Sequence, residues 1–77
     1  MEVKVFQKTQ RELASTINLL IDRYWNDEID ELHMVQSIKN LYLNNENKFI
    51  KNNQFTTVLR QQCGKRRLEV VSKILKV

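Results

Sequence analysis

The sequence predicts an all-α fold, a small bundle of four to five helices that ends in a helix–Gly–helix hairpin. The chain has no proline and one glycine, so few residues would interrupt a helix. Its apolar residues recur at helical spacing, which nearly excludes strands. We expect the 77 residues to form a single helical domain, 1–77. A domain of this size buries only about 60% of the surface that its unfolded chain exposes.

The first helix is predicted to begin after Thr9, because Thr9 and Glu12 match a capping box. Apolar residues then form one wide face: Leu13, Ala14, Ile17, Leu20, Ile21, Tyr24 and Trp25. The polar residues expected opposite it are Arg11, Ser15, Asn18 and Asp22. We expect Trp25 to pack in the core at the end of the bundle. The alternative is an exposed aromatic anchor, a residue type that dominates interface hot spots.

The second helix is predicted to begin in an acidic segment, residues 27–31, with either Asp27 or Asp30 as its cap. Negative charge is favoured at a helix start by the helix dipole. The expected apolar stripe comprises Leu32, Val35, Ile38, Leu41 and Tyr42, and the helix ends at Asn44-Asn45. A short helical turn over residues 47–51 is expected to bury Phe49 and Ile50.

A third main helix is predicted after Phe55, with Thr56 as its cap. Gly64 stands where a left-handed residue would end that helix. The inward-facing residues expected around this point are Val58, Leu59, Cys63, Leu68, Val70, Val71, Ile74, Leu75 and Val77. The solvated side of the last helix would carry Arg66, Glu69, Lys73 and Lys76. Near the other terminus, Val3 and Val5 suggest a short extended arm.

Positive charge is concentrated at the C-terminal end. Residues 55–77 hold six Lys or Arg and one Glu, a balance of +5, whereas residues 1–54 hold seven basic and eight acidic residues, a balance of −1. This asymmetry predicts a basic contact surface for an acidic partner, nucleic acid being the commonest. The predicted contact residues are Arg60, Gln61, Gln62, Lys65, Arg66, Arg67, Lys73 and Lys76.

The helix–Gly–helix layout suggests a helix-turn-helix, whose second helix enters the DNA major groove. Two positions depart from that motif: Arg60 stands where a small residue is usual, and Lys65 follows the glycine where an apolar residue is usual. Alternatively, the basic face is merely solvated, or is neutralised by Asp27 to Glu31. The acidic segment could also meet the basic face of another copy, in a head-to-tail contact.

The sequence offers no catalytic or metal-binding motif. His33 is the only histidine and Cys63 the only cysteine, too few for a zinc site. Cys63 lies at an apolar position, where a buried cysteine is the usual reading. The acidic residues 27–31 lack the glycine-shaped loop of a calcium site. We therefore predict that the chain is not an enzyme and binds no cofactor, metal or small-molecule substrate.

The expected location is cytoplasmic. No apolar run approaches the ~20 residues of a membrane span, and the first ten residues contain no hydrophobic signal-peptide core. A single cysteine cannot form an intramolecular disulfide. The expected function is a non-enzymatic, regulatory binding module. The alternative is a protein-interaction module without nucleic-acid contact, either a homodimer or a mobile-element protein that docks on a host factor.

Four sequence features occur together in the second half of the chain: Leu41-Tyr42, the Asn-rich residues 44–53, the Phe-Thr-x-Val entry at 55–58, and Gly-Lys-Arg-Arg-Leu-Glu at 64–69. In these features the chain resembles a family of small helical proteins, about eighty residues long, from low-GC Gram-positive bacteria and their mobile elements. The resemblance implies a bacterial or phage-related origin and brings no activity with it.

Overall fold

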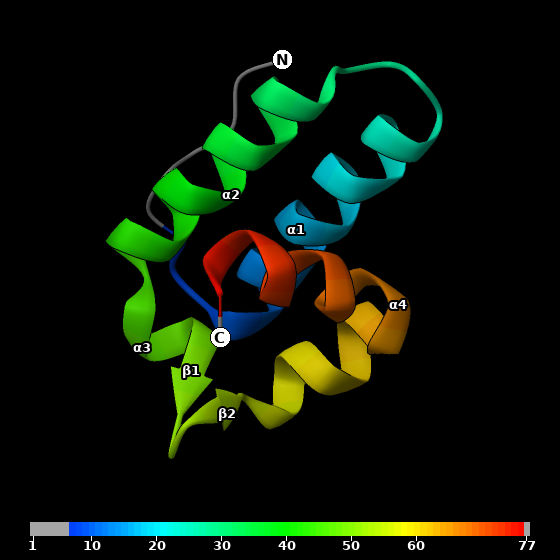
Figure 1. The fold of residues 1–77 in the computed structure, drawn as a ribbon. Coiled ribbons are helices and arrows are strands. Elements are labelled where there is room, and N and C mark those ends of the chain that lie inside the picture. The colour runs from blue at the N-terminus through cyan, green and yellow to red at the C-terminus, as the bar shows by residue number, and fades with distance from the viewer. Residues whose placement is uncertain (1–6, 77) are drawn as a thin grey trace.

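The computed structural model describes residues 7–76, which form a mostly helical protein with one small antiparallel hairpin (Figure 1). The elements in chain order are α1 (Gln10–Trp25), α2 (Glu31–Asn44), α3 (Glu46–Phe49), β1 (Ile50–Lys51), β2 (Gln54–Phe55) and α4 (Thr57–Leu75). Helices α1 and α2 lie side by side, and α4 packs across α1 (Figure 1). The predicted helical class is therefore confirmed, whereas the near-exclusion of strands is wrong.

Both threonines predicted as helix caps have that role. The Thr9 hydroxyl accepts a hydrogen bond from the Glu12 amide at 3.0 Å, at the start of α1. The Thr56 hydroxyl accepts one from the Leu59 amide at 3.4 Å, at the start of α4. Each bond satisfies a backbone donor that has no partner within its helix.

The cap of α2 is Asp30, not Asp27. A carboxylate oxygen of Asp30 accepts a hydrogen bond from the His33 amide at 2.8 Å. Asp27 instead has a left-handed backbone, with φ 60°, in the turn that follows α1. A helix cap requires an extended backbone, which Asp30 has. Asp27 lacks it, because its left-handed backbone forms part of the turn.

One hydrophobic core joins all four helices. Its buried residues are Leu13, Ala14, Ile17, Leu20, Ile21, Met34, Ile38, Leu41, Phe49, Leu59, Cys63, Leu68 and Val71. The predicted stripe of α1 is thus buried, apart from its last turn. In α2 the core face is centred on Met34, so the expectation for Leu32 is wrong: this side chain is 65% exposed.

The segment after α2 differs most from its prediction. The short helix α3 begins one residue earlier than expected and buries Phe49, and Ile50 then enters a strand. Strands β1 and β2 pair Ile50 with Phe55 around Asn52 and Asn53, whose φ angles are 55° and 64°. Two adjacent left-handed residues form the turn that suits a two-residue hairpin, and asparagine tolerates this backbone. The Asn52-Asn53 pair is therefore the feature of the sequence that indicates the hairpin.

Gly64 divides α4 into a first half (residues 57–63) and a second half (residues 65–75). Its φ is +81°, which confirms the predicted positive value, but its ψ of 169° is extended rather than left-handed helical. Almost only glycine adopts this combination. The helix resumes at once in a new direction (Figure 1). The predicted contributions of Val3, Val5 and Val77 lie outside the described residues.

Candidate functional site

Seven of the eight residues predicted as contacts lie on α4, and the eighth, Lys76, is its C-cap and is counted with α4 below. The structure separates the eight into two groups. Seven have exposed side chains: Arg60, Gln61, Gln62, Lys65, Arg66, Lys73 and Lys76. Arg67 is half-buried and faces α1. The sequence analysis predicted Arg67 as a contact residue like Lys65 and Arg66, because residue spacing does not show which side of a bent helix packs against another helix.

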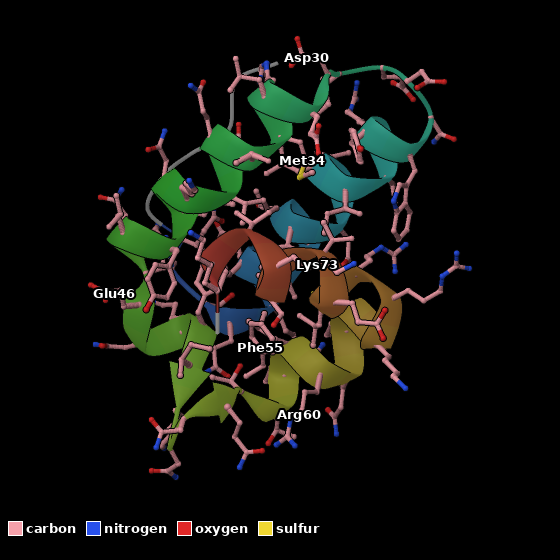
Figure 2. All side chains as sticks on the ribbon, viewed as in Figure 1. Asp30, Met34, Glu46, Phe55, Arg60 and Lys73 are labelled. Atoms are coloured by element: carbon pink, nitrogen blue, oxygen red, sulfur yellow. The ribbon has the colours of Figure 1, made fainter. Side chains whose placement is uncertain are left out.

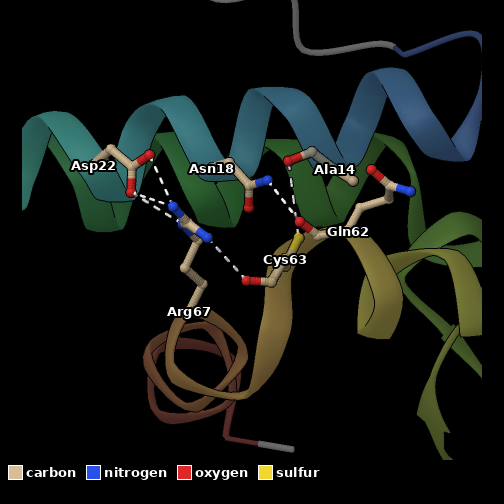
Figure 3. Close-up of polar contacts among 6 residues, drawn as sticks. All are labelled: Ala14, Asn18, Asp22, Gln62, Cys63 and Arg67. Atoms are coloured by element: carbon tan, nitrogen blue, oxygen red, sulfur yellow. Dashed lines mark hydrogen bonds and ion pairs between the residues drawn. The ribbon is translucent and has the colours of Figure 1, made fainter.

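Arg67 forms a two-armed contact with Asp22 of α1 (Figure 3). Its Nε and Nη2 atoms donate to the two carboxylate oxygens, each at 3.0 Å. Planar guanidinium and carboxylate groups match in this geometry, which makes such hydrogen bonds stronger than those between neutral groups. Asp22 was predicted to face solvent opposite the core; its side chain is 42% exposed, but it pairs with Arg67 of α4.

The break at Gly64 leaves backbone carbonyls that need donors. Arg67 supplies one, since its Nη1 donates to the Cys63 carbonyl at 3.1 Å. Asn18 supplies another, since its side-chain amide donates to the Gln62 carbonyl at 2.9 Å (Figure 3). Arg67 and Asn18 therefore connect the bend to α1. The guanidinium of Arg67 forms hydrogen bonds within the protein, unlike those expected of a residue that contacts a partner.

Arg60, from the first half of α4, and Lys65, from the second half, line the same hollow. The residues that line this hollow, of about 390 Å³, are Phe55, Arg60, Lys65, Leu68, Glu69 and Ser72. Arg60 also donates to the side chains of Gln54 and Thr57, both at 3.4 Å. We call this feature the basic hollow.

Arg66 and Lys73 lie toward α1 and α2 instead. The Arg66 guanidinium stands over the Trp25 ring, 5.9 Å from its centroid, and Lys73 lines a second hollow beside Trp25. Trp25 is 45% exposed, so its predicted place in the core is wrong. Tyr24, its neighbour, packs against the core. The cations of α4 thus occupy two regions rather than one continuous face.

No ion pair joins the acidic segment to α4 within residues 7–76, although Glu31 and Lys73 line the same second hollow. Within residues 7–76, Glu28 pairs with Arg23 at 3.1 Å, and Arg67 pairs with Asp22. Among the same residues, five α4 cations form no ion pair. They are Arg60, Lys65, Arg66, Lys73 and Lys76.

Cys63 is 3% exposed, and its thiol approaches the Ala14 carbonyl at 3.8 Å. Burial raises the pKa of Cys63 to about 11, and the nearby positive charge of Arg67 offsets only part of that rise. A thiol with so high a pKa is a poor nucleophile at neutral pH. Within the described chain, no three His, Cys, Asp or Glu residues lie close enough to hold a metal ion.

The fold and this surface define a small helical protein with a bent, basic C-terminal helix. None of its described helices has the length and hydrophobicity to cross a lipid bilayer. The chain belongs to a protein family described as "Conserved hypothetical protein", whose model matches residues 4–76. No curated protein and no solved structure matches it.

Proposed function

We propose that the chain is a non-enzymatic, regulatory binding module that contacts an acidic partner through α4. The observation that carries this proposal is the set of five α4 cations that stay exposed and without an ion pair in the described structure. A surface of unpaired cations attracts polyanions over long range and accelerates their association. The proposal includes the cytoplasmic location and the Gram-positive origin that were expected from the sequence.

Nucleic acid is one candidate for the partner. Lys65 and Arg66 begin the second half of α4, and Gln61 and Gln62 are exposed just before the bend. A helix-turn-helix has a turn of three or four residues, whereas a single residue interrupts α4. The geometry therefore favours contacts with phosphates over reading of base edges.

The test uses fluorescence anisotropy with a labelled random DNA duplex and with labelled polyglutamate, each at low and at physiological salt. The test variant is Lys65→Ser with Arg66→Ser. The matched control is Lys39→Ser with Lys51→Ser, which removes the same charge from exposed positions outside α4. We expect salt-sensitive binding that the α4 variant loses and the control keeps.

The outcomes separate the versions of the proposal. DNA binding that depends on α4 supports a nucleic-acid partner. Polyglutamate binding without DNA binding supports an acidic protein. Equal losses in both variants, or no binding to either polyanion at low salt, would overturn the assignment of α4 as an acidic-partner surface.

The second candidate function is a protein-interaction module without nucleic-acid contact, either a homodimer or a mobile-element protein that docks on a host factor. Large apolar side chains that are exposed to solvent support it, because such side chains can be buried against a partner. Their exposed fractions are 43% for Leu19, 45% for Trp25, 65% for Leu32 and 68% for Leu43. Leu32 and Leu43 are eleven residues apart on α2, about three turns, so they share one face. A Leu32→Ser, Leu43→Ser variant that keeps every protein contact of the wild type would exclude this face as the interface.

A further inference from the structure

The basic hollow has an apolar part and a positively charged part, and a ligand that fills it would contact both. Phe55 and Leu68 supply its apolar lining, and Phe55 offers the more accessible surface, because it is half-buried whereas Leu68 is 7% exposed. Arg60 and Lys65 border them with exposed positive charge, and Glu69 adds one carboxylate. The bend at Gly64 brings these residues together, because Arg60 belongs to the first half of α4 and Lys65 and Leu68 to the second.

Nucleic acid leaves half of this chemistry unused. Phosphates would pair with the cations, but the only apolar groups of a duplex backbone are small sugar C–H groups, which do not protrude far enough to fill the space between Phe55 and Leu68. A protein segment that carries an apolar side chain among carboxylates would satisfy both parts. Charge complementarity of this kind sets register and partner choice at protein interfaces.

The chain itself carries such a segment, where α2 begins. Leu32 is 65% exposed in the first turn of the helix, directly after the exposed Glu31. Asp27 is also exposed, and neither it nor Glu31 forms an ion pair within residues 7–76. We call residues 27–32 the acidic knob.

The acidic knob and the basic hollow lie at opposite ends of the molecule. In Figure 2, Asp30 marks the start of α2 at the top, and Arg60 and Phe55 mark the hollow toward the bottom. The knob of one molecule therefore cannot enter its own hollow, and the two surfaces can meet only between molecules. A contact between two different surfaces of identical chains is heterologous, or head-to-tail.

We propose that the basic hollow receives the acidic knob of a second copy of this chain, with Leu32 placed between Phe55 and Leu68 and its carboxylates facing Arg60 and Lys65. This inference rests on the proposed function, because it names the acidic partner of the same α4 surface. Association is weak and salt-sensitive, since a small contact stabilised by exposed charges buries less area than a permanent interface.

The test is sedimentation velocity with two complementary variants. The hollow variant, Arg60→Glu with Lys65→Glu, keeps an intact knob. The knob variant, Asp27→Asn with Glu31→Gln, keeps an intact hollow and carries a neutral knob that does not attract the acidic hollow of the first variant. A control, Lys8→Glu with Lys39→Glu, makes the same charge change as the hollow variant on exposed residues that line neither surface. Far-UV circular dichroism establishes that each variant is folded.

At low salt and up to about 1 mM protein, a concentration that detects weak contacts, we expect the wild type and the control to associate reversibly. Each complementary variant alone stays monomeric, and an equimolar mixture of the two forms a one-to-one dimer and nothing larger. This pattern follows because the mixture contains one intact knob facing one intact hollow. A monomeric mixture, or a variant that dimerises alone, would overturn the head-to-tail contact.

Two single substitutions test the apolar and the electrostatic parts separately. Leu32→Ala should weaken association about tenfold, the effect of losing a buried leucine side chain. Glu69→Gln should strengthen it about twofold, because a carboxylate no longer opposes the incoming acidic residues. If Leu32→Ala leaves association unchanged, the knob does not enter the hollow.

The inference and the proposed function can fail independently. A wild type that stays monomeric at low salt but binds polyglutamate through Lys65 and Arg66 removes the second copy as the partner and leaves the acidic-partner function intact. Self-association that survives both charge variants, without any polyanion binding, removes both.

Discussion

Asp22 and Arg67, 45 residues apart in the chain, form a two-armed ion pair that fixes the second half of α4 against α1. The same guanidinium donates to the Cys63 carbonyl across the bend and stands 5.9 Å from the centre of the Trp25 ring. One side chain thus joins the end of α1, the bend and the start of the second helical half. The contact thereby links the part of α4 that carries Lys65, Arg66 and Lys73 to α1.

We predict that Arg67→Ala lowers the free energy of unfolding by about 1–2 kcal/mol, because it removes hydrogen bonds to a charged partner and leaves the Cys63 carbonyl without its donor. Arg67→Lys should recover only part of the loss, since an ammonium group cannot reproduce the planar fork. Urea unfolding followed by circular dichroism measures both. The exposed neighbour Arg66→Ala is the control, and an equal effect there would show that the ion pair has no special role.

At the bend, Gly64→Ala should destabilise the protein by about 1–3 kcal/mol. The cause is backbone strain alone, because a methyl group at this position would meet no other atom within 4 Å, while φ is +81°. D-alanine at position 64, introduced by chemical synthesis, adds the same methyl group and suits a positive φ. It should leave stability unchanged or raise it slightly. If both alanines destabilise equally, strain is not the reason for glycine.

For Cys63, burial raises the pKa of the thiol from 9.0 to about 11. The unfolded chain therefore loses this proton first, so the stabilising contribution is complete below pH 9 and is lost as pH rises toward 11. Unfolding free energies of the wild type and of Cys63→Ala, measured between pH 8 and about 11, should show the steeper decline in the wild type. Parallel curves would contradict the prediction.

The same burial predicts slow chemistry at the Cys63 thiol. Iodoacetamide should modify the native protein at neutral pH far more slowly than the urea-unfolded protein, because the thiolate is the reacting species and is nearly absent in the fold. Mass spectrometry follows the reaction. Equal rates in the two states would show that the thiol is accessible and ionised in the native protein.

Two neighbouring threonines provide a matched test of the α4 cap. Thr56 accepts from the Leu59 amide and donates to the Lys48 carbonyl, and it is 6% exposed. Thr56→Ala should therefore lower stability by about 1–2 kcal/mol. Thr57→Ala removes the same atoms from an exposed position and should change it by less than about 0.5 kcal/mol. A larger loss at Thr57 would argue against the capping role.

Local chemistry made parts of the fold predictable. The caps at Thr9 and Thr56 follow from a hydroxyl that stands before a helical pattern, and the break at Gly64 follows from the one residue that tolerates its backbone. The buried stripe of α1 follows from helical spacing. The Asn52-Asn53 hairpin is equally local in cause, but only two residues form each strand, too few for an alternating pattern to show.

The tertiary structure decided the remaining features, all of which depend on which surfaces meet. Sequence spacing assigns residues to helix faces but does not say how far a neighbouring helix extends. Leu32 and Trp25 are therefore exposed although they continue apolar stripes, and Asp22 pairs with Arg67 of α4 although it continues a polar one.

By itself, the sequence determined the helical class, the main helix boundaries and the concentration of positive charge on the last helix, because these depend on residues close together in the chain. Only the tertiary structure assigned Arg67 to Asp22 and left five other α4 cations without an ion pair in the described part of the chain. It also brought Arg60 and Lys65 to one apolar hollow. These relationships depend on the bend at Gly64. The bend contacts α1 through residues more than forty positions away in the chain, so residue spacing within α4 does not predict them.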